Sequence, residues 1–420
     1  MKMKDSGIEW IGKIPNDWDQ KRIKYLYLTN KAKLPKEFSE DKNLIPYLSM
    51  DFIRDVSIRP IYAKDGDFCS KDDILLLWDG ANAGEIIFEH PEGYAPSTSA
   101  ILRKISKETE AVFDKYYLKA FEDELRKKTN GMGIPHVDGY FFRNSMFLIP
   151  PMNKQVNIAN YLDSKCSKID EVIQTQEQII EKLKDYKQAL ITETVTKGLD
   201  KSKAIKNSGY DFIGKIPESW KVCRLRNIGT PQNGISKGGE FFGHGFPFVT
   251  YRDVYKNFSI PEVASGLIES TKKEQEQYSV QEGDIFFTRT SETIDEVGFA
   301  SVCEKTIPNA TFAGFLIRVR PFTDDLITSF AKYYFRSQHH RFYLVKEMNL
   351  VTRASLGQDL LKSMPVLVPP KEEQQKIAAY LDVKCKAIDD SIEKKQQIIE
   401  RLAEYKKSLI YECVTGKKEV

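Results

Sequence analysis

The strongest constraint on this chain is that it repeats itself. The segment Ser6–Trp18 returns 202 residues later as Ser208–Trp220, and both copies contain the pattern Gly-Lys-Ile-Pro-x-x-Trp. A longer repeat begins at Pro150-Pro151 and returns 219 residues later at Pro369-Pro370. A duplicated unit of about half the chain predicts two similar ends related by a pseudo-twofold axis, which suits a target with two halves.

Composition is that of a folded protein, because 41% of the 420 residues are hydrophobic and 29% are charged. This length predicts roughly two to four domains. The net charge is only +3, so any surface that binds nucleic acid must be a local patch. The sequence has no apolar stretch at its start and no run of about 18 apolar residues, which predicts a soluble cytoplasmic protein without a membrane span.

The motifs of common enzyme and metal sites are missing. We find no GxxxxGK[ST] phosphate loop, no GxGxxG after a strand, no HExxH and no GxSxG. The six cysteines have no CxxC spacing, and the repeat equivalents Cys166 and Cys385 lie in helical patterns, where we expect small core side chains. His339 and His340 are adjacent on an expected helix, hence on different faces, which does not suit a metal pair. We therefore expect no catalytic residue, no metal and no cofactor.

Two regions, 1–150 and 202–369, combine short apolar runs with aromatic and turn residues, which predicts mixed α/β globules. The expected helices are 112–128 and 325–345. The expected strands are 74–78, 86–88, 147–149, 284–288 and 315–319.

Each globule is followed by a region of helical periodicity, 151–201 and 370–420. Apolar residues recur there in steps of three and four, which is typical of a long amphipathic helix with a coiled-coil seam. The seam positions are Ile158, Leu162, Cys166, Ile169, Ile173, Ile180, Leu183 and Leu190 in the first copy, and Ile377, Leu381, Cys385, Ile388, Ile392, Ile399, Leu402 and Leu409 in the second.

The simplest way for each helix to bury its apolar seam is to pack antiparallel against the other copy of the repeat. This arrangement would place one globule at each end of the rod. Gln176 and Lys395 occupy equivalent seam positions, where a polar layer can fix the register. Pro150-Pro151 and Pro369-Pro370 favour helix starts. Two separate bundles or a homodimer remain as alternatives. The lysine-rich connector 197–207 is typical of a flexible linker.

Two different globules, each followed by a long helix that opens with Pro-Pro-x-x-x-Gln, resemble the specificity (S) subunit of type I restriction–modification systems. The similarity covers the whole chain. The matching segments are Pro150–Gln155 with Pro369–Gln374, Ile158–Asp163 with Ile377–Asp382, Ile169-Asp170 with Ile388-Asp389, Ile179–Leu183 with Ile398–Leu402, Tyr186-Lys187 with Tyr405-Lys406, and the Ile-Pro-x-x-Trp entries at 14–18 and 216–220.

This resemblance implies an α+β fold in which two pseudo-symmetric α/β target recognition domains are separated by two long antiparallel helices. Each domain would read one half of a bipartite double-stranded DNA target, and the helices would set the spacing. Members of this family are not enzymes themselves. They hold two methyltransferase (M) subunits, which use S-adenosylmethionine, and the full complex adds two restriction/translocase (R) subunits.

Reading bases requires planar donor and acceptor groups on loops that reach a groove of the DNA. The candidates follow expected strands, and the segments 73–79 and 284–290 occupy equivalent places. The candidate DNA-binding residues are Trp78, Asp79, Gly80, Asn82, Ser97, Thr98, His136, Tyr251, Arg252, Arg289, Thr290, Ser291, Arg353 and Ser355. Arg289 or Arg353 facing guanine and Asn82 facing adenine are the sharpest hypotheses.

Three alternatives stay open at the level of sequence. Clusters of Ser, Thr, Asn and Gly after a strand also form ordinary turns. Exposed arginines also contact phosphates. The chain as a whole could be a coiled-coil protein-interaction scaffold that never contacts DNA, or a stand-alone nuclease or methyltransferase with a divergent site.

Overall fold

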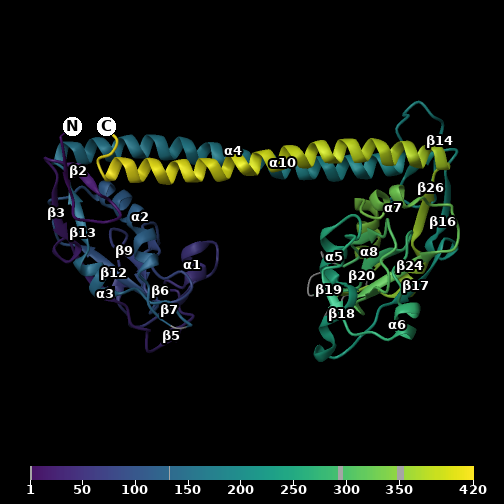
Figure 1. The fold of residues 1–420 in the computed structure, drawn as a ribbon, viewed down its shortest axis with the longest axis horizontal. Coiled ribbons are helices and arrows are strands. Elements are labelled where there is room, and N and C mark those ends of the chain that lie inside the picture. The colour runs from purple at the N-terminus through teal and green to yellow at the C-terminus, as the bar shows by residue number, and fades with distance from the viewer. Residues whose placement is uncertain (1, 132, 292–296, 348–353) are drawn as a thin grey trace. The chain divides into compact units, whose positions relative to one another are not determined.

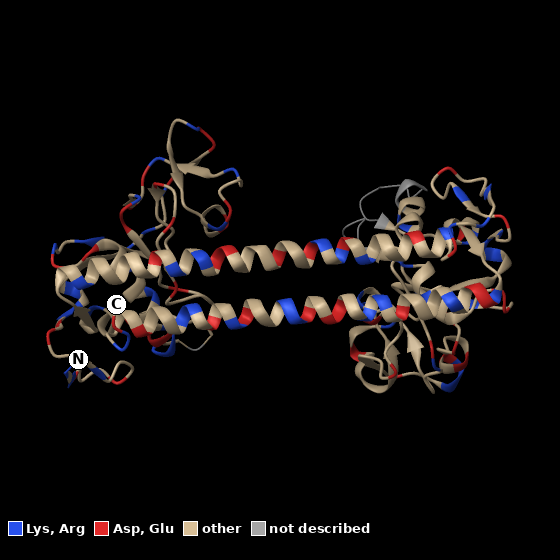
Figure 2. Ribbon diagram, turned by 90° about the horizontal axis from the view of Figure 1, so that it is seen from above, with Lys and Arg blue, Asp and Glu red and all other residues tan. Residues whose placement is uncertain are grey.

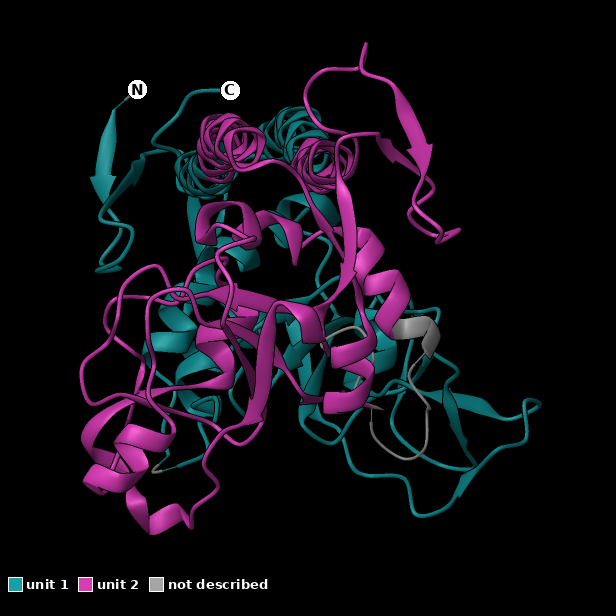
Figure 3. Ribbon diagram, turned by 90° about the vertical axis from the view of Figure 1, so that its right-hand side faces the viewer, with its two compact units in different colours: residues 1–176, 397–420 teal, residues 177–396 magenta. Residues whose placement is uncertain are grey.

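The computed structural model describes residues 2–131, 133–291, 297–347 and 354–420. The chain divides into two compact units, unit 1 (Met1–Gln176 and Gln397–Val420) and unit 2 (Glu177–Gln396). Two long helices, α4 (Met152–Lys197) and α10 (Lys371–Val414), each contribute one half to unit 1 and the other half to unit 2 (Figure 3). None of the described helices is both long and apolar enough to span a membrane.

Unit 1 is built on a four-stranded antiparallel sheet in the order β10-β9-β12-β4. Its two central strands, β9 and β12, are labelled in Figure 1. A five-stranded sheet, β5-β7-β6-β11-β8, and the pairs β1-β2 and β13-β3 complete its strands. The strands are β1 (Met3–Asp5), β2 (Lys13–Pro15), β3 (Asp19–Arg22), β4 (Tyr27–Lys31), β5 (Phe38–Ser39), β6 (Ile45–Tyr47), β7 (Ile61–Ala63), β8 (Phe68–Cys69), β9 (Ile74–Leu77), β10 (Ile86–Ile87), β11 (Gly93–Tyr94), β12 (Ser99–Lys104) and β13 (Met146–Ile149). The helices are η1 (Ile23–Tyr25), α1 (Met50–Arg54), α2 (Ala111–Lys127) and α3 (Gly139–Asn144).

Unit 2 repeats this plan around the sheet β17-β24-β20-β22. Its other sheets are β19-β18-β23 and the pairs β14-β15, β16-β26 and β21-β25. The strands are β14 (Ile205–Asn207), β15 (Lys215–Pro217), β16 (Lys221–Arg224), β17 (Gly229–Asn233), β18 (Phe242–Val249), β19 (Gly266–Ile268), β20 (Ile285–Thr288), β21 (Thr290–Ser291), β22 (Ala300–Val302), β23 (Thr311–Phe312), β24 (Leu316–Pro321), β25 (Ala354–Ser355) and β26 (Pro365–Val368). The helices are η2 (Leu225–Asn227), η3 (Gly239–Phe241), α5 (Tyr251–Lys256), α6 (Lys272–Gln277), α7 (Thr328–Tyr334), α8 (Gln338–Glu347) and α9 (Gln358–Ser363).

The expected α+β fold is confirmed, with one difference in the helices. The expected helix 325–345 is two helices, α7 and α8, with a break at 335–337. Arg336 turns inward at the break and donates to the carbonyls of Ala300 (2.5 Å) and Asn257 (2.5 Å). The inward guanidinium therefore fixes a bend where the periodicity alone predicts a continuous helix.

Both long helices begin directly after a Pro-Pro pair, and each is joined to its domain by a buried glutamine. Gln155 donates from Nε2 to the carbonyls of Pro150 (2.7 Å) and Glu108 (3.0 Å), and its Oε1 accepts from the N–H of Glu110 (2.7 Å). Gln374 makes the same three bonds with Pro369 (2.8 Å), Asp325 (2.7 Å) and Ile327 (2.9 Å). The glutamine of the Pro-Pro-x-x-x-Gln motif therefore ties the helix start to the loop that precedes the main domain helix.

The seam positions are buried or half-buried along both helices. In unit 1, Ile158, Leu162 and Cys166 of α4 belong to the same core cluster as Leu409 and Cys413 of α10. In unit 2, Ile191 and Val195 of α4 share a core with residues 377–385 of α10. Gln176 and Lys395 are both half-buried, as expected for polar seam positions.

Repeated charged residues pair between the two copies of the helix. In unit 1, Asp170 of α4 bonds to Lys406 of α10 (2.7 Å), and in unit 2, Lys187 of α4 bonds to Asp389 of α10 (2.6 Å). Moving along α4 in unit 1 from Tyr161 to Asp170, the partner on the C-terminal segment moves back from Lys418 to Lys406, so the helices run antiparallel there. Acidic and basic residues are interspersed along both helices in Figure 2.

The connector after α4 is more ordered than a flexible linker. Gly198 ends the helix with φ +72°, the left-handed conformation that favours glycine at a helix end. Lys203 then pairs with Glu373 (3.0 Å), and the last three residues of the connector form β14. The flexible-linker prediction is therefore wrong for the end of this segment, because β14 pairs with β15.

His339 and His340 both lie in the core of unit 2. The expectation that they point to different faces of the helix is therefore wrong. Both rings pack on Tyr334, at centroid distances of 5.5 and 4.2 Å. Burial lowers the pKa of His339 to about 3, and burial together with His339 lowers the pKa of His340 well below its ordinary value.

We expect this histidine pair to make unit 2 acid-labile. An unfolded histidine titrates near pH 6.5, so the unfolded state binds more protons below that pH and stability is lost as the pH falls from 6.5 toward 3. For His339 the loss is about 2 kcal/mol by pH 5. His339→Leu should roughly halve the drop in melting temperature between pH 7.5 and 5.5, whereas His244→Gln, at an exposed histidine, should leave the drop unchanged. An equal drop in His339→Leu and wild type would contradict this.

Gln374→Leu should destabilise unit 2, because it leaves the carbonyls of Pro369 and Asp325 and the N–H of Ile327 without their partner. The expected cost is about 2–4 kcal/mol, measured as a shift of the urea unfolding midpoint. Gln375→Leu, at an exposed glutamine of the same helix within unit 2, is the matched control. Equal midpoints for the two variants would show that the glutamine does not hold the junction.

Candidate nucleic-acid interface

In unit 1 the candidate residues come together where strand β9 ends. The backbone N–H groups of Trp78 and Asp79 both donate to the carbonyl of Thr98, at 2.7 and 3.1 Å. Gly80 donates to Pro135 (3.0 Å), and Val137 donates back to the carbonyl of Trp78 (2.9 Å). Three loops that are far apart in sequence, 78–82, 97–99 and 135–137, are therefore held at one strand end.

Asp79 organises the charge at this strand end. Its carboxylate bonds to Lys31 Nζ (2.7 Å) and to His136 Nδ1 (2.6 Å). Burial raises the pKa of Asp79, but the hydrogen bonds from Lys31 and His136 outweigh this and hold the pKa below its ordinary value. The carboxylate thus stays ionised and holds the Lys31 ammonium and the His136 ring in place, with 51% of the His136 side chain exposed.

The remaining candidates of unit 1 differ in exposure. Asn82 and Thr98 are exposed in turns, whereas Trp78 and Ser97 are half-buried. A Cβ on Gly139 would lie 2.7 Å from the Trp78 ring, so glycine at the start of α3 permits this packing. Gly80 has φ +103°, which turns the chain out of the strand toward Asn82.

In unit 2 the equivalent strand end is occupied by Arg289, after β20. Its N–H donates to the carbonyl of Phe315 (2.8 Å), and Leu356 donates to the carbonyl of Arg289 (2.7 Å). The guanidinium Nη1 lies 3.4 Å from the carbonyl of Gly314, and Thr290 pairs with Ser355 across β21 and β25. Ser291 lies in β21, and Arg353 lies outside the described residues.

Tyr251 and Arg252 are less directly connected to this strand end. They open α5, where Thr250 caps the helix, and Arg252 is exposed while Tyr251 stacks on Tyr255 at 6.0 Å. Val249, just before them, accepts a hydrogen bond from Ala313 (3.0 Å). They are linked to Arg289 through the 313–315 loop and not by a direct contact in the described part of unit 2.

The two strand ends share one backbone arrangement. Trp78 and Arg289 each donate to the loop before the next strand of the sheet and each accept from the segment before a short helix. The side chains differ, because a tryptophan stands in unit 1 where an arginine stands in unit 2. The equivalence of segments 73–79 and 284–290 that the sequence predicts therefore holds in three dimensions.

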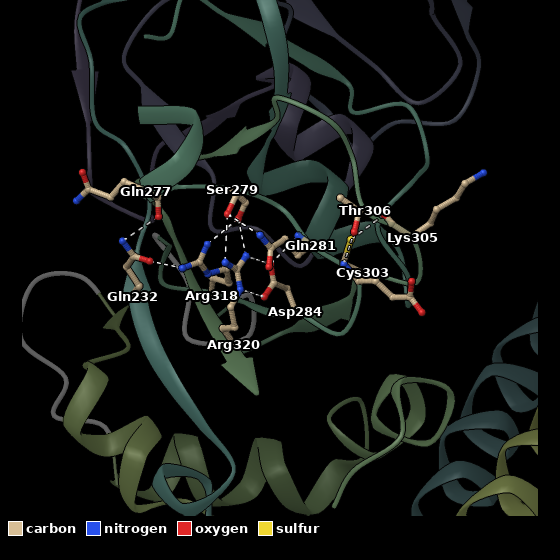
Figure 4. Close-up of polar contacts among 11 residues, drawn as sticks. Gln232, Gln277, Ser279, Gln281, Asp284, Cys303, Lys305, Thr306, Arg318 and Arg320 are labelled. Atoms are coloured by element: carbon tan, nitrogen blue, oxygen red, sulfur yellow. Dashed lines mark hydrogen bonds and ion pairs between the residues drawn. The ribbon is translucent and has the colours of Figure 1, made fainter. Parts of the chain in front are cut away.

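The same equivalence appears at the start of these strands. Arg103 binds Asp73 through Nε (3.0 Å) and Nη2 (2.8 Å), and Arg320 binds Asp284 in the same way at 2.7 and 2.6 Å. In unit 2 the network extends to Arg318, which donates to Ser279 (2.6 Å) and bonds to Gln232 (Figure 4). Burial lowers the pKa of Arg318 to about 10. Asp73, Asp284 and Arg318 are buried, so these ion pairs hold the sheet together, although 49% of the Arg103 side chain remains exposed.

Sequence reasoning missed two residues at the strand ends. Lys31 belongs to β4, and only the pairing of β4 with β12 brings it to Asp79. Phe315 is 63% exposed in the turn that binds Arg289, where the sequence predicts only the start of a strand. Exposed aromatic rings at turns can insert between or stack on bases, which is a signal that the sequence already contained.

Among the described residues, no group of three or more His, Cys, Asp or Glu could hold a metal ion. The six cysteines are free, and all except the half-buried Cys223 are buried. Burial raises the pKa of Cys385 to about 11, so this thiol is protonated.

Comparison with known proteins identifies the class. The family model described as the type I restriction modification DNA specificity domain matches this chain twice, at residues 15–197 and 217–402. The chain therefore belongs to this family, the DNA-sequence-recognising specificity subunits of type I restriction–modification systems.

Its relatives match over nearly the whole chain. The type I restriction enzyme MjaVIII specificity subunit of Methanocaldococcus jannaschii is 29% identical, over 97% of this chain and 94% of that protein. The EcoBI specificity subunit of Escherichia coli is 24% identical, over 85% of this chain and 76% of that protein. A chain from a structure that addresses complex assembly and conformational transition of the type I R-M system has the same fold, with a TM-score of 0.70 at 15% identity, over 96% of this chain and 99% of that one.

Proposed function

We propose that this chain is the non-catalytic DNA-recognition subunit of a type I restriction–modification complex and that it reads a bipartite target. The observation that carries the proposal is the shared backbone arrangement at the two strand ends, which presents Trp78 and its neighbours in unit 1 and Arg289 in unit 2. One scaffold with different side chains in two copies is what two different half-sites require. Half-sites read from one face lie about one DNA turn, roughly 34 Å, apart or at multiples of it.

We propose that the recognition domains are residues 1–150 and 202–369 and that the spacer helices are 151–201 and 370–420. Arg289 is the principal candidate for reading guanine, because its half-buried side chain is oriented by Gly314 and an arginine fork matches the O6 and N7 atoms of that base. Asn82, exposed after Gly80, is the candidate for adenine. His136, Thr98 and Arg252 are exposed and suit phosphate or base contacts.

Two methyltransferase subunits would bind the repeated outer faces of α4 and α10, because equivalent surfaces bind equivalent partners. Two restriction/translocase subunits would join the full complex, in the prokaryotic cytoplasm. Catalysis would reside in these partners, and the chain would need no cofactor of its own. Removing residues 371–420 is a poor test of this docking, since Leu409 and Cys413 belong to the core of unit 1.

Arg289→Ala should relax sequence preference in one half-site only. Loss of one bidentate guanine contact costs about 1–3 kcal/mol, roughly 5- to 150-fold in affinity for that half-site. Binding of a library randomised in one half-site at a time measures this, with Arg226→Ala, an exposed arginine on η2, as the control. A uniform loss for all sequences would show that Arg289 contacts a phosphate.

DNA binding by the assembled complex should weaken steeply as salt rises, because each neutralised phosphate releases a counterion. With about six phosphate contacts, affinity should fall roughly a thousandfold between 50 and 200 mM salt. Fluorescence anisotropy with target and scrambled duplexes measures the slope. A complex whose DNA affinity is negligible at every salt concentration would favour the protein-interaction scaffold.

A further inference from the structure

Unit 1 contains an open groove of about 710 Å³ between the domain helix α2 and the paired long helices. Its apolar walls come from Val112 and Tyr116 of α2, Ile173 of α4, Ile410 of α10 and Phe88 after β10, and Lys406 lies at its edge. Tyr116 donates to Asp163 (2.8 Å), and Lys406 bonds to Asp170 (2.7 Å). The side chains of this groove are therefore held in place although nothing fills it.

The equivalent position in unit 2 is filled by Phe258. Tyr333 is the counterpart of Tyr116, because it donates to the repeat-equivalent Asp382 (2.7 Å), and Lys187 is the counterpart of Lys406. The Phe258 ring lies 5.7 Å from the Tyr333 ring and 5.3 Å from Lys187 Nζ. The guanidinium of Arg336 lies 5.1 Å from the same ring. The fold thus has a built position for one aromatic side chain, and unit 1 leaves it vacant.

The backbone next to the aromatic position shows the same difference. In unit 2, Val302 of the edge strand β22 donates to the carbonyl of Phe258 (3.0 Å) and accepts from the N–H of Ile260 (2.8 Å). Phe88 is the counterpart of Val302, since each lies four residues after a glycine that donates to the central strand (Gly84 and Gly298). None of the described residues of the chain hydrogen-bonds to the main chain of Phe88. An edge-strand position with free donors and acceptors can add an extended segment.

The counterpart segment of unit 1, residues 55–58, follows α1 as residues 257–260 follow α5, but it turns away. Asn257 donates its side-chain N–H to the carbonyl of Asp253 (2.9 Å), and the chain continues extended. Asp55 has no such donor. It accepts instead from the N–H (2.9 Å) and Oγ (2.6 Å) of Ser57, which closes a tight turn. Val56 is left 68% exposed, and its side chain is smaller than the aromatic ring that the position takes.

We propose that the groove of unit 1 is a docking site for an extended segment of a partner protein that carries one aromatic residue. The aromatic ring lies against Tyr116 and Lys406, and the backbone of the segment pairs with Phe88 as residues 258–260 pair with β22. The site gives the two halves of the molecule different partners despite their duplicated design. It does not depend on DNA recognition, which uses the strand ends at Trp78 and Arg289.

The probe is a synthetic peptide of residues 254–262, the segment that fills the equivalent position in unit 2, with p-benzoylphenylalanine in place of Phe258. Irradiation with the full-length protein, without DNA, should give a saturable crosslink that mass spectrometry places at Phe88, Val112, Tyr116 or Ile173. Excess unmodified peptide should suppress the crosslink at least tenfold. A peptide with Phe258→Ala should not suppress it.

The double variant Asp55→Asn with Val56→Phe gives unit 1 the residues of unit 2 and should fill the groove with the chain's own segment. Hydrogen exchange of residues 56–58 should slow, and the peptide crosslink should fall at least tenfold. Asp41→Asn, at an exposed aspartate that closes a similar turn with Asn43, should leave both unchanged. The melting temperature confirms that each variant is folded.

Three results would overturn the proposal. One is a crosslink outside the groove or one that excess peptide does not suppress. Another is slow hydrogen exchange at residues 56–58 of the free wild-type protein, which would mean that the chain's own segment already occupies the groove. The third is a crosslink that persists in the folded double variant. All three leave the assignment to DNA recognition untouched, because no DNA is present.

Discussion

The fold of each unit depends on burying the apolar seam of one long helix against the other. Neither helix would be stable alone with this seam exposed to water, because a long helix of this polarity is stabilised mainly by packing. In unit 1, Leu409 and Cys413 of α10 join the core formed by Ile158 and Leu162 of α4. The ion pair Asp170–Lys406 adds little free energy at a half-exposed site, but it marks the register in which the seams meet.

The glutamines at the helix starts transmit this packing to the domains. Gln155 and Gln374 are fully buried, and each satisfies two carbonyls and one N–H that would otherwise be without partners. Such a polar group is costly to bury unless all its bonds are made, so the junction has one preferred geometry. The strand end that carries the candidate residues is thereby fixed relative to the helix of its own unit. Positional accuracy of this kind is what a protein that recognises sequence by geometry requires.

Sequence alone predicted the duplication, the long helices, the seam residues and the equivalence of 73–79 with 284–290, because periodicity and repetition are local signals. It did not predict the bend at Arg336, whose cause is a set of carbonyls about 80 residues away in the chain. It also missed Lys31, which only strand pairing brings to Asp79. The candidate residues 78–82, 97–98 and 136 were named from turn chemistry, and their convergence depends on long-range hydrogen bonds that no sequence pattern encodes. Their contact with DNA stays a prediction.

Unit 1 is built from two separate segments of the chain, and this affects how it folds during synthesis. Its core is completed by residues 397–420, and the whole of unit 2, residues 177–396, is translated in between. At roughly 5–20 residues per second, the ribosome needs on the order of 10–40 s to make that stretch. During this time Ile158, Leu162 and Cys166 in the first half of α4 lack the part of their core that Leu409 and Cys413 supply. A nascent chain of this kind depends on the synthesis of residues 397–420, so a nonsense mutation at the start of that segment would leave unit 1, which is made first, without part of its core.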